Sequence, residues 1–377
     1  MMTASILTLD HDPCPHRTPL ERIGFELGWD YAHHRLQPPA PFDGQASALR
    51  QGLLAGRATF GLRTLQPTRA VRKWLQLRLH AWLRGRSVEL FQVTPHFLRQ
   101  IDVSHCPITR VALSVATLQG SDASVDRVRN DAGYAAGNLA VISTRANHAK
   151  GAHGFRSALR KAREADLAST AETPAPTRPA DVAASLTADE WWRAAILCSF
   201  VEPLAHEEAV TLPMRVLPPN RLRLFNPVQA LQALLSRQLL QPGWSRRFGR
   251  FETRLHGKAA RRDFRAFVLA LLPRVLEAGP PADPQAAREA IEDAWSNALV
   301  QKRWQAFAGP LGAAACEELV VRAAADRLST QHVERLGASL ATEGWNLETR
   351  GYVPHRELLP VDDDHAQMPL ALAVGMP

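Results

Sequence analysis

The sequence predicts an α+β protein, a mostly helical chain that carries one small ββα unit. Two observations lead to this class. Apolar residues recur at helical spacing over most of the chain, for example at Val71, Leu75 and Leu79. Only residues 106–150 place short β-type apolar runs beside closely spaced turn residues and a capped helix start.

The bulk composition is that of an ordinary globular protein with a basic excess. A chain of 377 residues with 46% hydrophobic and 22% charged residues has enough apolar material for two or three domains. It holds 45 Lys and Arg against 37 Asp and Glu, a net charge of +8. This balance favours polyanionic partners without identifying one.

The cysteines and the N-terminal residues predict a cytoplasmic protein that does not associate with membranes. The four cysteines are scattered and form no CxxC pair, which indicates reduced thiols rather than a disulfide framework. Residues 1–20 carry acidic residues where a signal peptide would need an apolar run. The most apolar segment, residues 264–276, contains Pro273 and is too short to cross a bilayer.

Composition and periodicity divide the chain into four segments. We predict a helical N-terminal region at 1–100, a ββα unit at 101–165, an Ala/Pro/Thr-rich linker at 166–184 and an all-helical C-terminal domain at 185–377. Cap-plus-proline pairs such as Thr18-Pro19, Asn226-Pro227 and Asp283-Pro284 mark helix starts. The expected elements are helices toward His34 and at 68–84, 94–101, 228–240 and 285–307, one or two more within 313–340, and a strand at 87–93.

The ββα unit contains the chemistry-bearing residues. Asp126 should lie at the end of one strand, and residues 130–137 supply the turn residues of a short, stiff loop. Residues 139–142 form an apolar β-type run. Ser143 or Thr144 then caps a helix that carries Asn147 and Lys150 three residues apart, on one face.

This order resembles the HNH endonuclease family, whose strand–loop–strand–helix (ββα-metal) unit holds one divalent cation against a phosphodiester. The resemblance covers residues 106–151. It implies that Asp126 and Asn147 are ligands of Mg²⁺ or Mn²⁺, and that Asn138 holds the intervening loop rigid. Carboxylate and amide oxygens are suitable ligands for such hard cations.

One residue departs from the family pattern. The family's general base is usually a His beside the acid, whereas Arg127 follows Asp126 here. An arginine cannot accept a proton at neutral pH, but it can clamp a phosphate with two hydrogen bonds. The base would then be His148, His105 or His153, or the metal-bound water would act unaided. The Asp-Arg pair resembles a known subgroup of HNH-type proteins.

The local charge also suits a nucleic acid. Residues 106–163 hold nine Lys or Arg and three Asp. We expect Arg127, Arg129, Arg145 and Lys150 to contact phosphates. The leading hypothesis is a metal-dependent endonuclease that acts on DNA or another nucleic acid, with a phage-related or defence role. Its protein partners are not predicted.

Two alternatives remain open from the sequence. The chain could be a non-catalytic nucleic-acid-binding or scaffold protein whose HNH unit is degenerate, or a structural helical protein that binds no nucleic acid. Outside the unit, Arg246, Arg247, Arg250 and Arg254 form either a basic patch or a solvated loop.

Overall fold

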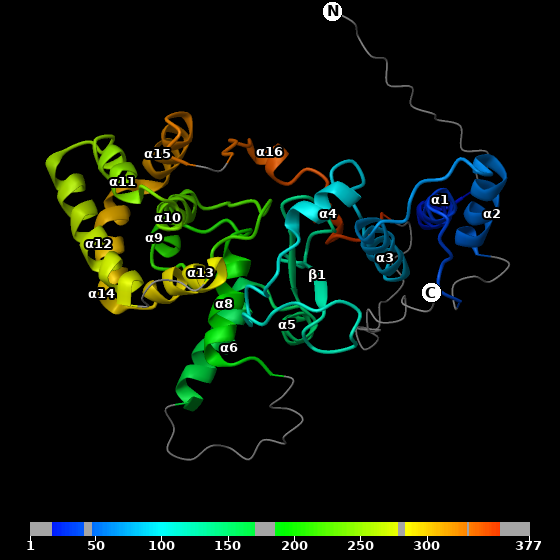
Figure 1. Ribbon diagram of the computed structural model, residues 1–377, viewed down its shortest axis with the longest axis horizontal. Helices are drawn as coiled ribbons and strands as arrows, with labels where there is room; N and C mark the ends of the chain where they lie inside the picture. Colours follow the sequence, from blue (N-terminus) through cyan, green and yellow to red (C-terminus); the bar gives the residue numbers. More distant parts are fainter. Residues whose placement is uncertain (1–16, 41–46, 170–184, 278–282, 330–331, 355–377) are drawn as a thin grey trace, which may run out of the picture. The chain divides into compact units, whose positions relative to one another are not determined.

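The computed structural model describes residues 17–40, 47–169, 185–277, 283–329 and 332–354. These residues are mostly helical and hold one two-stranded sheet, which confirms the α+β class (Figure 1). No helix within these ranges is long and apolar enough to cross a membrane. They divide into two compact units, one of residues 17–87 and 352–354, the other of residues 88–351.

The first unit packs three helices around a small apolar core: α1 (Pro19–His33), α2 (Ala48–Phe60) and α3 (Arg69–Leu83). The predicted capping box at Thr18 and Glu21 is confirmed, and so is the helix at 68–84. The sequence analysis did not predict α2. Its glycines are poor helix formers, yet a Cβ on Gly52 would lie 1.9 Å from the Phe25 carbonyl oxygen. The close backbone approach of α1 and α2 therefore requires residues that weaken the helical signal.

The second unit begins with α4 (Pro95–Ile101), as predicted. The strand predicted at 87–93 is wrong, because Val88 makes only an isolated bridge to Tyr134. The Glu89 carboxylate instead accepts hydrogen bonds from the backbone N–H groups of Phe91 and Gln92, and this turns the chain.

The ββα unit has the predicted elements. Strand β1 (Ala123–Arg127) pairs antiparallel with β2 (Leu139–Ser143), and Asp126 stands opposite Ala140. Helix α5 (Thr144–Lys150) follows at once, and Ser143 caps it by accepting from the Ala146 N–H.

The helices after the unit are listed here with their bounds: α6 (Phe155–Ser169), α8 (Ala188–Ser199), α9 (His206–Ala209), α10 (Pro227–Gln238), α11 (Trp244–Glu252), α12 (Lys258–Glu277), α13 (Pro284–Ala294), α14 (Ala298–Ala308), η2 (Gly309–Leu311), α15 (Gly312–Ala325), α16 (Ala338–Ala341) and η3 (Leu347–Thr349). The single helix predicted at 285–307 is wrong. Asn297 ends the run and caps α14 by accepting from Leu299 and Val300 N–H groups. Of the predicted linker, 166–169 belong to α6 and 170–184 lie outside the described residues.

One hydrophobic core joins the ββα unit to the C-terminal helices. Ile142 of the hairpin belongs to the same buried cluster as Trp191, Leu231 and Trp304 of the helices. Trp345 is also buried in it, and its indole N–H donates to the Ala136 carbonyl of the hairpin loop at 3.2 Å. The hairpin is therefore not packed as a separate domain, and the compact units do not follow the divisions predicted from composition.

Candidate functional site

One face of β1 meets one face of α5. Ser124 and Asp126 are the buried positions of the strand, and residues two apart in a strand point to the same side. Asn147 donates its side-chain N–H to Ser124 Oγ at 2.8 Å. Lys150 Nζ lies 2.9 Å from Asp126 Oδ2. The fold thus brings Asp126, Asn147 and Lys150 to one place.

The Asp126–Lys150 ion pair is almost fully buried, with 7% and 0% of the two side chains exposed. Lys150 Nζ also donates to the Arg127 carbonyl at 3.0 Å. Asp126 Oδ2 has no hydrogen-bond partner, although Lys150 Nζ lies within ion-pair distance of it. A buried charge that loses its only counter-ion is strongly destabilising, so each partner needs the other.

The donor set at this place fits a hard divalent cation that keeps part of its water. Asp126 Oδ2 is a buried oxygen without a hydrogen bond, and the Asn147–Ser124 bond uses the amide nitrogen, which leaves the amide oxygen for another partner. Mg²⁺ is commonly held by one or two carboxylates plus water and phosphate oxygens. The described residues contain no cluster of three or more His, Cys, Asp or Glu suited to a metal. A bound metal ion would have to share the Asp126 carboxylate with the ammonium group of Lys150, which already pairs with it.

Asn138 fixes the loop between the strands. Its fully buried side chain accepts from the Arg129 N–H at 2.8 Å and donates to the carbonyls of Arg129 and Gly133 at 3.0 and 3.1 Å. Its backbone carbonyl accepts from the Val128 N–H. One side chain therefore satisfies three backbone groups across the loop, all of them buried or partly buried.

We expect Asn138→Ala to lower the free energy of unfolding by several kcal/mol, because each buried polar group left without a partner costs about 1–3 kcal/mol. Asn130→Ala is the matched control, since its amide makes a single bond to the His153 carbonyl at 3.2 Å. Urea denaturation of the full chain measures both. Equal losses for the two variants would contradict the role given to Asn138.

Arg127 lies on the other face of β1 from Asp126, because neighbouring strand residues alternate. Its Nη1 donates to the carbonyls of Asn130 and Ala132 at 2.9 and 2.8 Å, and its guanidinium lies 5.3 Å from the centre of the Tyr134 ring. The side chain is only partly buried. Arg127 closes the loop from the side opposite the Asp126–Lys150 pair.

The other predicted phosphate contacts are engaged within the protein. Arg129 pairs with the Asp131 carboxylate at 2.7 and 2.9 Å. Arg145 donates to the Ser185 carbonyl and pairs with Glu190, the capping-box acid of α8. Arg145 thus secures the start of α8 and is not brought to Asp126.

The histidines named as possible bases lie around α5. His148 is on its exposed side, and partial burial of the ring lowers its pKa. Burial, with the charges of Lys161 and Lys150, also lowers the pKa of His153. Both rings are therefore neutral at pH 7 and can accept a proton. His105 Nδ1 is bonded to Ser104 Oγ at 3.0 Å. Within the part of the chain that the structure describes, no hydrogen bond joins any of these rings to Asp126.

Two residues beyond the unit reach this region, and sequence analysis missed both. Burial raises the pKa of the Cys198 thiol to about 11, with Lys150 and Asp126 close enough to act on it, so the thiol stays protonated at neutral pH. Burial also raises the pKa of Glu202, and Arg156 and Arg129 act against this. No local pattern marks either residue, because only the shared core brings them here.

Comparison with known proteins adds no relative. A scan against protein-family models, a search of the curated proteins and a search of the solved structures each found no match. The functional argument therefore depends on the residues and contacts described above.

Proposed function

We propose that the chain is a metal-dependent endonuclease of the HNH type that hydrolyses phosphodiester bonds in DNA. The observation that carries this proposal is the packing of α5 on β1, which gathers Asp126, Asn147 and Lys150 behind a loop fixed by Asn138. The same residues, in the same order, are the ones that the resemblance to the HNH family assigns to the site.

Each residue has a distinct part in this proposal. Asp126 and Asn147 would hold Mg²⁺ or Mn²⁺, which supplies an activated water and stabilises charge on the phosphate oxygens. Lys150 orients Asp126 from within the protein through the buried ion pair. His148 is exposed on the same short helix, and its neutral ring can accept a proton from the attacking water. Arg127 is beside the acid in sequence and has its remaining N–H groups for a phosphate.

The test is cleavage of plasmid DNA by the purified full chain. We expect nicking with Mg²⁺ or Mn²⁺, loss of nicking with EDTA, and recovery when either cation is restored. The absence of nicking with any divalent cation, in a preparation that is folded by circular dichroism, would overturn the hydrolase proposal.

A second candidate is a non-catalytic nucleic-acid-binding or scaffold protein. The observation that favours it is that Asp126 is already paired with a buried lysine and that Arg127 is bonded to loop carbonyls. This candidate predicts retention of an oligonucleotide without cleavage, with a steep dependence on salt and no change in Asp126→Asn. A structural protein with no nucleic-acid partner predicts no retention even at low salt.

A further inference from the structure

Two adjacent helices of the C-terminal region begin with cations. Neither α11 nor α12 has an acid in its first turn, and the α11 N-cap, Gly243, makes no side-chain cap hydrogen bond. Helix N-termini carry a partial positive charge and are stabilised by acids. Helix α8 follows that rule, with Asp189 and Glu190 in its first turn. The basic starts of α11 and α12 therefore add positive charge to helix ends that are already positive.

Helix α12 arranges its cations on one face. Lys258, Arg261, Arg262 and Arg265 are spaced i, i+3, i+4 and i+7, all of them exposed; we refer to these four as the α12 basic face. Phe264, Phe267 and Leu271 occupy the opposite, buried side. The core is filled without the four cations, so packing does not explain them.

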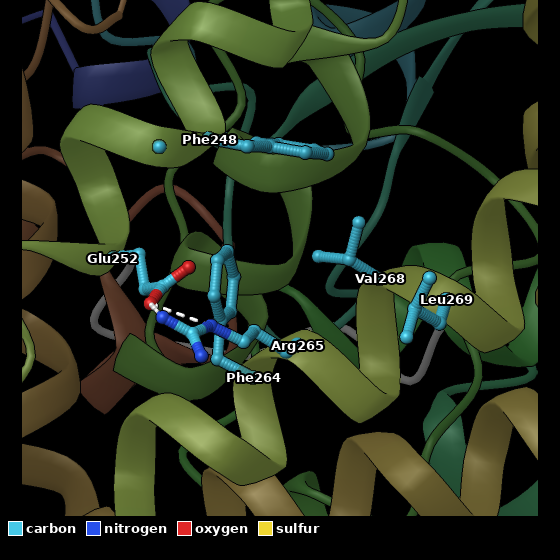
Figure 2. A pocket seen from close by; sticks show the side chains of 7 residues that line it. Phe248, Glu252, Phe264, Arg265, Val268 and Leu269 are labelled. Carbon is cyan, nitrogen blue, oxygen red and sulfur yellow. Dashed lines mark hydrogen bonds and ion pairs between the residues drawn. The ribbon is translucent and has the colours of Figure 1, made fainter. Parts of the chain in front are cut away.

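The cations of this face make few contacts within the protein, and Arg261 donates from Nε to the Leu255 carbonyl at 3.0 Å. Arg262 pairs with its own neighbour Asp263. Arg265 pairs with Glu252 of α11, as Figure 2 shows. Both Arg265 and Glu252 line a groove with a volume of about 320 Å³. Both arginines are more than half exposed, and exposed pairs contribute little to stability. In the described part of the chain, Lys258 has no ion pair or hydrogen bond.

The wider segment has the same sign. Residues 244–265 hold eight Lys or Arg and two acids. Arg250 donates to the Asp326 carbonyl at the end of α15, and Arg254 pairs with the Asp326 carboxylate. Neither is therefore counted in the α12 basic face. Arg246 is exposed and has no ion pair or hydrogen bond to any residue that the structure describes. Its charge adds to the positive potential at these helix starts.

We propose that the α12 basic face binds the sugar–phosphate backbone of duplex DNA, as a contact separate from the ββα unit. The choice of DNA rests on the proposed function, whereas the choice of a polyanion rests on the charges. Seven residues of helix span about 10 Å, and each strand of duplex DNA carries about three phosphate charges over that length of its axis. A row of four cations thus faces a comparable row of anions.

The experiment measures binding of a fluorescent duplex oligonucleotide to the full chain by anisotropy, in EDTA and at several salt concentrations. We expect Arg261→Ala/Arg262→Ala to weaken binding about tenfold and to reduce the slope of log affinity against log salt by about 2, since each phosphate contact contributes about 0.9. Arg261→Lys/Arg262→Lys should keep most of the affinity because the charge is retained.

The matched control is Arg274→Ala/Arg322→Ala, which removes two exposed arginines that each pair with a Glu of their own helix. It should bind as the parent does. Equal affinity of the parent and the Arg261→Ala/Arg262→Ala variant would overturn this inference, as would equal weakening in the control. Thermal melting by circular dichroism identifies any variant that fails to fold, and in that case the lysine variant and the salt slope of the parent decide.

The outcomes separate this inference from the proposed nuclease. If the parent protein binds duplex DNA through the α12 basic face but never nicks it, the inference is supported and the nuclease proposal is contradicted. If the parent nicks plasmid DNA and the Arg261→Ala/Arg262→Ala variant binds duplex as the parent does, the nuclease proposal is supported and the inference is contradicted. No retention of duplex by the parent at low salt contradicts both.

Discussion

Replacement of Asp126 by alanine is expected to abolish plasmid nicking and to destabilise the fold. Nicking is lost because Asp126 is the carboxylate that we propose as a ligand of the divalent cation. Stability falls by about 3–5 kcal/mol because Lys150, with no exposed surface, is left as an uncompensated buried charge. Plasmid nicking and urea denaturation measure the two effects separately.

A second variant distinguishes catalysis from folding. In Asp126→Leu/Lys150→Met both charges are removed, and we expect most of the lost stability to return because buried ion pairs can be replaced by apolar residues at little cost. Nicking should stay absent. Asp131→Asn is the matched control, since Asp131 is a half-exposed acid of the same loop and pairs with Arg129. It should nick at close to the parent rate. Nicking by the folded double variant would exclude Asp126 from the site.

The sequence predicted the hairpin and its helix because their signals are local. The turn residues at 130–137, the apolar run at 139–142 and the Ser143 cap each act within a few residues, and the structure contains the corresponding strands and helix. Helix α10 was predicted for the same reason, from the Asn226-Pro227 pair.

The features that were missed depend on contacts between distant residues. Helix α2 contains glycines that lower its propensity and serve only its packing on α1. Arg145 was expected to contact phosphate because it is a cation near the motif, but its partner Glu190 is 45 residues away. The pairing of Lys150 with Asp126 could not be predicted either, since helical spacing indicates the face of Lys150 and not the atom opposite it.

Arg127 decides how the reaction could proceed without the family's usual histidine. We expect Arg127→Ala to lower the nicking rate about 100-fold, the usual effect of losing one donor to a developing charge. It should also lower stability, because Nη1 no longer satisfies the carbonyls of Asn130 and Ala132. Mn²⁺ affinity, measured by calorimetry, should stay nearly unchanged, since the proposed metal ligands are Asp126 and Asn147 and not Arg127.

Arg127→Lys separates the two roles of the side chain. A lysine ammonium can donate to both loop carbonyls, so stability should return toward that of the parent. The rate should recover little, because a point charge lacks the two-pronged geometry with which a guanidinium holds a phosphate. If the lysine variant regains both stability and rate, Arg127 acts on the loop alone and is not a phosphate contact.

Arg127→His tests the resemblance to the HNH family directly. The change places the family's usual base beside Asp126, so a site of the HNH kind should nick at least as fast as the parent. Its rate should fall below about pH 6.5, where an ordinary imidazole becomes protonated and can no longer accept a proton.

The pH profile of the parent depends instead on the pKa of the base that the parent uses. Because burial lowers the pKa of His148, the parent should keep its rate to lower pH than the Arg127→His variant. Coinciding acid limbs in the two profiles would show that the introduced imidazole does not act as the base, because the variant still contains His148. A parent profile without an acid limb would exclude His148 as the base and leave the metal-bound water to act unaided.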